Sequence, residues 1–393
     1  MEQINKSFKA NIRQYGMIIV MVVLVLFFYA TTGGKFVKPM NVYNIIMQNG
    51  YVLVLAIGML LPILIGTIDL SVGSVVAVIG SIAGIMMYRW GQPVWLALIV
   101  CLLCGLIIGI WQGFWIAIVN LPPFIATLGG MLIFRGITLV LLQGKTLAPL
   151  PNSYVQISSG YIPDYISQIL GKESKLNITT MVIAAILCFL VLLGELRTRR
   201  QKLKYGFQAS GIGTILFKVA LISAAILLVS WRLALYKGIP FVLVIVGVLA
   251  IFYTFILNNT TIGRHIYALG GNARAAELSG IKVRNVRYGI FVNMAFMSAV
   301  AGIVFSSRLN SASPLAGQNF EMDAIASCYL GGASASGGIG TIMGALVGGL
   351  IMGILNNGMS LMGISSDVQQ IVKGLVVIFA VASDILSKTK SSK

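Results

Sequence analysis

The chain has 393 residues, of which 58% are hydrophobic and only 10% are charged, and its mean hydropathy is +0.94. A soluble domain carries about 25% charged residues, so this composition excludes an ordinary water-soluble fold. The 28 Lys and Arg residues outnumber the 10 Asp and Glu residues and give a formal net charge of +18. In so apolar a chain, this excess indicates basic loops on the inner side of a membrane rather than nucleic-acid binding.

Apolar segments long enough to cross a bilayer, about 20 residues each, recur along the sequence and predict an all-α, polytopic transmembrane bundle. We expect about twelve spans in a single domain covering 1–393, with both termini in the cytoplasm. Pro122 and Pro123 divide the longest uncharged stretch into two spans. The predicted spans are 16–30, 42–66, 69–88, 94–119, 123–142, 177–196, 211–231, 239–257, 288–307, 321–336, 340–357 and 367–386.

The predicted span 321–336 differs from the others because it is short, begins with two acids and runs into GGASASGGIG. Non-helical backbone at membrane depth is tolerated only where protein shields it or where it lines a wet cavity. Both a full span and a re-entrant segment fit this pattern. A weak likeness between IDLSVGS at 68–74 and MDAIAS at 322–327, each an acid ahead of small residues, hints at a distant duplication.

The polar segments set the expected orientation. With the N-terminus inside, the basic segments 197–206 and 261–287 and the basic C-terminal tail all fall on the cytoplasmic side. An external loop is expected near 143–176, where three prolines disfavour regular structure. An extra helix pair follows it near 177–231, and a cytoplasmic segment near 259–287 connects two later spans.

The residue types needed for catalysis are missing from the sequence. It contains no GxxxxGK[ST] phosphate-binding loop, and its one histidine, His265, lies in a basic segment. We therefore expect no catalytic residues, no metal site and no cofactor bound by this chain.

Acidic residues near the ends of spans are the next candidates, because ionisable groups at membrane depth are costly and are often functional. Asp69 precedes Leu-Ser-Val-Gly and is interpreted first as a helix cap, and Asp323, beside Glu321, is interpreted in the same way. An ion-coupled secondary carrier that uses Asp69 and Asp323 is the alternative. It would need a base paired with a buried carboxylate, and the bases are expected in the loops.

A short helix is predicted within the segment 259–287. Asn272 is a good N-cap and Gly280 a good stop, and ARAAELS between them has a high helix propensity. A solvated connecting helix and a helix that docks onto a cytoplasmic partner both fit this pattern. The helix comprises Asn272, Ala273, Arg274, Ala275, Ala276, Glu277, Leu278, Ser279 and Gly280.

Five stretches together resemble the permease subunits of bacterial ABC importers for monosaccharides, and most of all the xylose and multiple-sugar permeases. They follow the order of that family from near residue 40 to near residue 380. The stretches are IGTIDLSVGS at 65–74, NLPPFIATLGGMLIFRGI at 120–137, GRHIYALGGNARAAELSGIKV at 263–283, SSRLNSASPLAGQNFEMDAIASCYLGGASASGGIG at 306–340 and NNGMSLMGISSDVQQIVKGLVV at 356–377.

The resemblance implies a subunit of the bacterial inner (plasma) membrane that translocates a xylose-like pentose or hexose. A periplasmic sugar-binding protein would deliver the sugar, a second permease copy would complete the pathway as a homodimer, and a cytoplasmic ABC ATPase would bind ATP and Mg. The predicted helix 272–280 would be the ATPase-coupling helix. The extra helix pair matches an insertion that distinguishes the xylose-type from the ribose-type subunits.

A neutral sugar requires hydrogen-bonding side chains rather than fixed charges along its path. The polar candidates within or beside the predicted spans fit hydrogen bonds between helices at least as well as sugar contacts. They are Gln48, Asn49, Asp69, Gln112, Asn120, Asn293 and Asn356. The alternative remains an ion-coupled secondary sugar carrier.

Overall fold

A computed structural model describes residues 12–171, 175–207 and 211–391 of the chain, so part of each basic terminus lies outside the described residues. Nine helices in these ranges are long and apolar enough to cross a membrane. The predicted fold class, a polytopic helical membrane protein, is confirmed, whereas the number of twelve spans stays a prediction.

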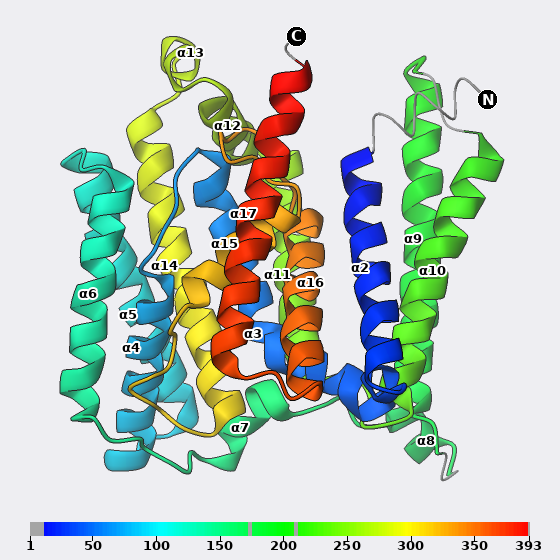
Figure 1. The fold of residues 1–393 in the computed structure, drawn as a ribbon, viewed down its shortest axis with the longest axis horizontal. Helices are drawn as coiled ribbons and strands as arrows, with labels where there is room; N and C mark the ends of the chain where they lie inside the picture. The colour runs from blue at the N-terminus through cyan, green and yellow to red at the C-terminus, as the bar shows by residue number, and fades with distance from the viewer. Residues whose placement is uncertain (1–11, 172–174, 208–210, 392–393) are drawn as a thin grey trace.

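The helices run through the bundle in alternating directions (Figure 1). The first half contains α2 (Ile12–Thr31), η1 (Lys35–Val37), α3 (Pro39–Leu64), α4 (Val72–Gly84), η2 (Ile85–Arg89), α5 (Val94–Gly113), η3 (Phe114–Ile118), α6 (Pro123–Leu142), α7 (Asn152–Ser159) and α8 (Tyr165–Ile169). The second half contains α9 (Ile178–Lys204), α10 (Ile212–Ala234), α11 (Phe241–Asn259), α12 (Thr261–Gly271), α13 (Ala273–Leu278), α14 (Val283–Leu309), α15 (Phe320–Leu330), α16 (Ile342–Leu361) and α17 (Ser366–Ser391).

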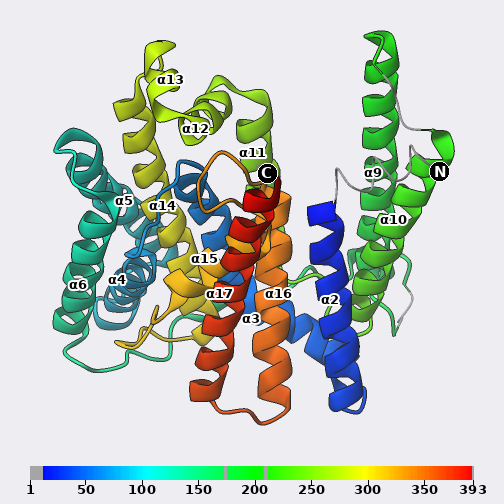
Figure 2. The same cartoon turned by 45° about the horizontal axis from the view of Figure 1, so that its top comes forward.

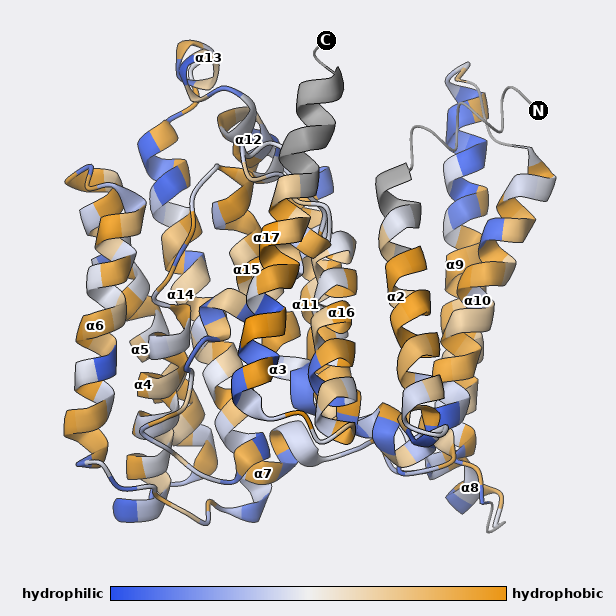
Figure 3. Cartoon of the chain, viewed as in Figure 1, coloured by the Kyte–Doolittle hydropathy of each residue, from blue (hydrophilic) through white to orange (hydrophobic). Residues whose placement is uncertain are grey.

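The two ends of the bundle differ. We call the end with α12 and α13 the α13 end, and the opposite end, with α7 and α8, the α8 end (Figure 1). The described start of α2 and the end of α17 both lie at the α13 end. Figure 3 shows hydrophilic residues at this end on the last turns of α9 and the first turns of α14, where the basic segments lie. The basic segments therefore share one end, as expected for one side of a membrane.

Two segments are more helical than predicted. The expected loop 143–176 contains α7 and α8, and α7 starts directly after Pro151, a position where proline fits because the first helical N–H groups need no partner within the helix. Tyr154 of α7 is fully buried, and its hydroxyl lies 2.7 Å from Oγ of Ser306 on α14. The expected loop 197–206 belongs mostly to α9, because its Arg, Lys, Gln and Leu residues favour a helix.

The share of buried residues in each helix distinguishes the centre of the bundle from its edge. In the most apolar 18-residue window of each helix, 89% of the α3 residues but only 17% and 11% of the α9 and α10 residues are buried. A helix that is apolar on all sides belongs in a core when it is buried and against lipid when it is exposed. The helix pair α9–α10 is thus an edge of the bundle, and it lies apart from α4, α5 and α6 in both views (Figures 1 and 2).

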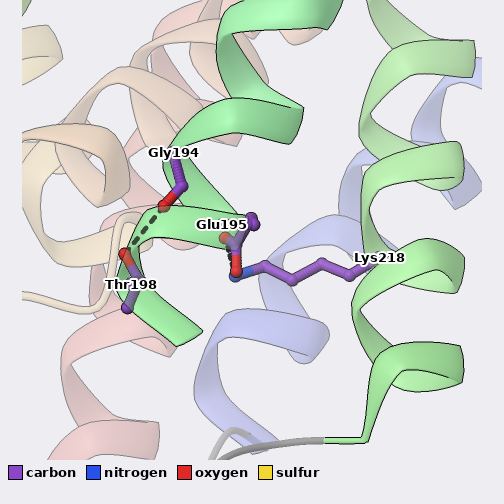
Figure 4. Close-up of polar contacts among 4 residues, drawn as sticks. All are labelled: Gly194, Glu195, Thr198 and Lys218. Carbon is purple, nitrogen blue, oxygen red and sulfur yellow. Dashed lines mark hydrogen bonds and ion pairs between the residues drawn. The ribbon is translucent and has the colours of Figure 1, made fainter. Parts of the chain in front are cut away.

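Polar contacts join α9 to α10 and to α8. Lys218 on α10 forms an ion pair with Glu195 on α9, with 2.6 Å between Nζ and Oε1 (Figure 4). Toward the α8 end, the Asp164 carboxylate accepts hydrogen bonds from the backbone N–H groups of Ser167, Ile178 and Thr179, at 3.3, 2.9 and 3.0 Å, and from the hydroxyls of Ser167 and Thr179. Asp164 is therefore the N-cap of α8 and also pairs the first two N–H groups of α9, whose own N-cap is Asn177.

Two of the helices begin inside the bundle. The non-helical segment 65–71 leads into α4 from the α13 end, and 310–319 leads into α15 from the α8 end. With 11 residues, α15 is about 16 Å long, roughly half of the hydrocarbon core. The predicted helix 321–336 is therefore wrong beyond Leu330, because Gly332, with φ +79°, turns the chain away.

The N-termini of α4 and α15 meet, and the two helices point to opposite ends of the bundle (Figure 1). A Cβ added at Gly73 would lie 2.1 Å from the carbonyl oxygen of Gly317, and one added at Gly317 would lie 1.8 Å from that of Gly73. Around them, α4 packs on α14 while α15 packs on α3. This inverted arrangement accounts for the likeness between IDLSVGS and MDAIAS, since each motif lies at the start of a helix that begins inside the bundle.

Candidate functional site

The junction of α4 and α15 places a carboxylate deep in the bundle. Asp69 is 1% exposed, and its Oδ1 accepts hydrogen bonds from the backbone N–H of Ser71 at 2.9 Å and the Ser71 hydroxyl at 2.7 Å. The expectation that Asp69 caps α4 is therefore wrong: Ser71 is the residue before α4, and Asp69 bonds Ser71 instead of the N–H groups of the first turn. Among the described residues, Asp69 Oδ2 has no hydrogen-bond partner although it is buried.

Gln112 completes this polar cluster from α5. Its side chain is fully buried, and its Nε2 donates to Ser71 Oγ at 2.9 Å and to Asp69 Oδ1 at 3.3 Å. Burying polar groups is costly unless they are paired, so a free carboxylate oxygen in this cluster is a strong acceptor for any donor that reaches it. Sequence reasoning named Asp69 and Gln112 but missed Ser71, whose hydroxyl joins them.

Two bases hold the segment that leads into α15 and the first turn of that helix. Arg135 on α6 donates to the carbonyl oxygens of Ala316 at 2.6 Å and Pro314 at 3.4 Å. Lys373 on α17 lies 3.0 Å from Asp323 Oδ1, in a pair whose side chains are 21% and 5% exposed. The expectation that the bases sit in loops is therefore wrong for Arg135 and Lys373. A buried carboxylate needs such a partner, because desolvation makes an isolated charge costly.

Three of the other predicted polar candidates lie where α3 meets α16. Gln48 Oε1 accepts a hydrogen bond from Asn357 Nδ2 at 3.4 Å, and a Cβ added at Gly353 would lie 2.7 Å from the side-chain amide of Asn49. Asn356 precedes Asn357 on α16, and its Oδ1 is buried without a partner among the described residues. A buried bond of 2.8 Å between Asn41 and Asn357 also joins these helices, and neither residue was singled out in the sequence.

The remaining two candidates lie elsewhere. Asn293 on α14 accepts a hydrogen bond from the Tyr253 hydroxyl on α11. Asn120 is exposed at the α13 end, beside α13. Of the predicted polar residues, the structure therefore brings only Asp69 and Gln112 together at the α4–α15 junction. Within the described ranges, no group of three or more His, Cys, Asp or Glu side chains is placed to hold a metal ion.

The predicted short helix forms at the α13 end as α13. Asn272 Oδ1 accepts a hydrogen bond from the Ala275 N–H at 3.0 Å, which confirms the expected cap, and Gly280 turns the chain with φ +84°. Ala276 is the buried residue of this helix, whereas Leu278 is 80% exposed. A single exposed leucine is common on a protein surface, so docking of α13 onto a partner stays a prediction.

The helix before it, α12, was not anticipated, and it packs against backbone. A Cβ added at Gly270 would lie 1.8 Å from the carbonyl oxygen of Leu64 and 2.7 Å from the backbone nitrogen of Gly338. Gly338 donates its N–H to Leu64 at 2.8 Å, and the Gly337 backbone lies beside both. We call Leu64, Gly270, Gly337 and Gly338 the glycine junction.

The glycine junction connects α12, the helix before α13, with the segments that adjoin α4 and α15. Leu64 is the last residue of α3, immediately before the segment that leads into α4. Gly337 and Gly338 belong to the segment that follows α15, and the Tyr267 hydroxyl of α12 donates to Gly340 in the same segment at 2.8 Å. Displacement of α12 would therefore press on the connections of α4 and of α15 at once, because closely packed backbone transmits strain.

Most of the chain is similar to known permease proteins. Residues 41–381 match the family described as branched-chain amino acid transport system / permease component. The xylose transport system permease protein of Haemophilus influenzae is 39% identical over 380 residues, 97% of this chain and 98% of that protein. That of Escherichia coli is 37% identical over 381 residues, 97% and 94% of the two chains. The ribose import permease protein of Bacillus subtilis is 34% identical over 350 residues, 89% and 86% of the two chains. No solved structure matches the chain.

Proposed function

The chain belongs to the family of branched-chain amino acid transport system permease components, and from this premise we propose that it is the membrane-spanning subunit of an ATP-binding-cassette importer for a xylose-like monosaccharide. The observation that carries the proposal is the similarity to xylose permeases along nearly the whole chain. The α4–α15 junction adds physical support, because discontinuous helices that meet at mid-depth commonly form the substrate sites of transporters.

In this proposal the α13 end faces the cytoplasm of a bacterial inner membrane, as the basic segments favour. An ABC ATPase that binds ATP and Mg docks there on α13, and a periplasmic sugar-binding protein docks at the α8 end. A second copy of the chain completes a homodimer. The chain itself then acts as a transporter subunit and carries out no catalysis.

The sugar would pass between α4 and α15. Asp69 Oδ2 is a buried acceptor without a partner among the described residues, and it suits a donating sugar hydroxyl. Ser71 and Gln112, which already bond the other carboxylate oxygen, hold Asp69 in place and offer further donors and acceptors. This set of groups fits a neutral polyhydroxylated ligand better than an apolar one.

ATP-driven closure of the motor would push α13, and α12 would pass the displacement through the glycine junction to the segments 65–71 and 331–341. Both α4 and α15 then move together, which opens the α4–α15 junction to one end of the bundle and closes it to the other. A bistable junction of this kind converts a small shift at one site into a change of access at another.

The test is uptake of labelled xylose by a bacterial strain that lacks its own pentose uptake. The strain expresses the chain with or without its ATPase and binding protein, and other pentoses and hexoses serve as competitors. We expect uptake only with all three components, competition by xylose above other sugars, and loss of uptake in Asp69→Asn with the protein still in the membrane. Uptake by the chain alone would contradict the proposal.

The second candidate, an ion-coupled secondary sugar carrier that uses Asp69 and Asp323, draws its support from the buried Lys373–Asp323 pair. It predicts uptake that survives ATP depletion and collapses with the ion gradient. It also predicts that Asp323→Asn abolishes transport as completely as Asp69→Asn does. The importer proposal predicts the opposite response to the two energy sources.

A further inference from the structure

A basic pocket of about 410 Å³ lies at the α13 end, between α13, the start of α14 and the residues just after η3. Three guanidinium groups line it, those of Arg274, Arg284 and Arg287, and Glu277 is the one acid among its lining residues. Within the described residues, none of the three arginines forms an ion pair or a side-chain hydrogen bond. The pocket therefore concentrates uncompensated positive charge in a concave site.

The residues that line the pocket indicate its level in the membrane. Ala117 and Asn120 lie at the end of the α5–η3 span, and Arg284 and Arg287 occupy the first turns of the α14 span. Exposed apolar side chains border the same turn, with Val119 at 44% and Phe124 at 60% exposure. Charged groups that adjoin exposed apolar groups at the ends of spans mark the headgroup level of a bilayer.

We propose that this pocket binds the phosphate of an anionic phospholipid headgroup, with the acyl chains lying along the exposed apolar side chains of Val119 and Phe124. Guanidinium groups form bidentate hydrogen bonds with phosphate oxygens, which gives both strength and orientation. Basic pockets between transmembrane helices bind anionic headgroups in this way. A free phosphate would use the arginines but not the apolar border.

The pocket and the surface proposed for the protein partner share α13, because Arg274 and Glu277 line the pocket. Leu278, the most exposed apolar residue of α13, is not among the lining residues, so a partner can contact Leu278 without filling the pocket. A bound headgroup would join Arg274 of α13 to Arg284 and Arg287 of α14. It would thus fix the orientation of α13 relative to the bundle, whatever cargo the protein carries.

Native mass spectrometry of the detergent-solubilised full chain tests this site. The chain is titrated with dioleoyl phosphatidylglycerol and, separately, with dioleoyl phosphatidylcholine. Each basic residue near the surface contributes about fivefold to anionic lipid binding, so the unaltered chain is expected to retain phosphatidylglycerol at least tenfold better than phosphatidylcholine. Excess inorganic phosphate is expected not to displace the lipid. Equal retention of the two lipids, or displacement by free phosphate, would overturn the proposal.

The variant R284Q/R287Q locates the effect. Its preference for phosphatidylglycerol is expected to fall to about the level of phosphatidylcholine. The control R264Q removes an exposed base of α12 at the same end but outside the pocket, and it is expected to keep the preference. If R284Q/R287Q keeps the lipid preference and instead loses only its co-purification with the ATPase, the pocket receives acidic groups of the partner protein and the lipid proposal is wrong.

Discussion

Replacement of Gly270 by alanine tests whether movement passes from α13 into the bundle through the glycine junction. The added Cβ would lie 1.8 Å from the carbonyl oxygen of Leu64, which is backbone and has no rotamer by which to move away. Carbon and oxygen in weak contact lie about 3.3–3.6 Å apart, so α12 and α3 must separate by about 1.5 Å. Gly270 has an ordinary helical backbone, so crowding alone produces the effect.

The neighbouring residue Gly271 provides a matched control, because a Cβ there meets nothing within 4 Å. Overpacking costs about 1–3 kcal/mol, whereas alanine in place of an unconstrained helical glycine stabilises by about 0.5–1 kcal/mol. We expect Gly270→Ala to lower the apparent Tm of the solubilised protein and Gly271→Ala to leave it equal or higher.

The two variants are also expected to differ in transport activity. The overpacking is expected to affect one access state more than the other, and a difference of about 1 kcal/mol between the two alters their populations by about fivefold. ATP-driven uptake by Gly270→Ala should therefore fall by about that factor or more. Co-purification with the ATPase should persist, because the cap and the exposed face of α13 are unchanged. Equal uptake and equal Tm in the two variants would refute the role of the glycine junction.

The remaining predictions concern charged groups. Lys373→Gln leaves Asp323 buried without its base and should lower the free energy of unfolding in detergent by about 3–5 kcal/mol. Lys218→Gln breaks a more exposed pair and should lower it by about 1 kcal/mol or less. Similar losses of unfolding free energy in the two variants would refute the burial assigned to the Lys373–Asp323 pair. Burial alone would raise the pKa of Asp164, but its five hydrogen bonds outweigh this and lower the pKa. The stability from Asp164 is therefore complete above its unfolded-state pKa of about 3.9 and is lost as the pH falls below it; unfolding of Asp164→Asn followed against pH should lack this loss. Glu277→Arg should reduce co-purification with the ATPase and uptake while the chain stays in the membrane, and normal values of both would exclude α13 as the coupling helix.

The sequence alone predicts the features that depend on neighbouring residues. The span 123–142 coincides with α6, because two prolines precede or start it and an apolar run, with Arg135 as its one charged residue, continues it. The Asn272 cap follows from one favourable side chain ahead of a run of helix formers. Apolar length and local capping are sufficient to find these elements, since neither needs a distant contact.

The arrangement of the site depends instead on contacts between distant segments. Asp69 and Gln112 lie 43 positions apart, and their hydrogen bond depends on where α4 starts, three residues later than the predicted span. The glycine junction unites Leu64, Gly270 and Gly338, and in the sequence its glycines look like ordinary loop residues. The depth of Lys373 is equally hidden, because one base within an apolar stretch does not reveal the acid that it meets.

The most direct test of the central claim is xylose accumulation in proteoliposomes that contain this chain, its ATPase and its binding protein, with either ATP or an ion gradient as the sole energy source. We expect accumulation with ATP in the presence of ionophores, and none with a proton or sodium gradient in the absence of ATP. Accumulation driven by the gradient alone would contradict it.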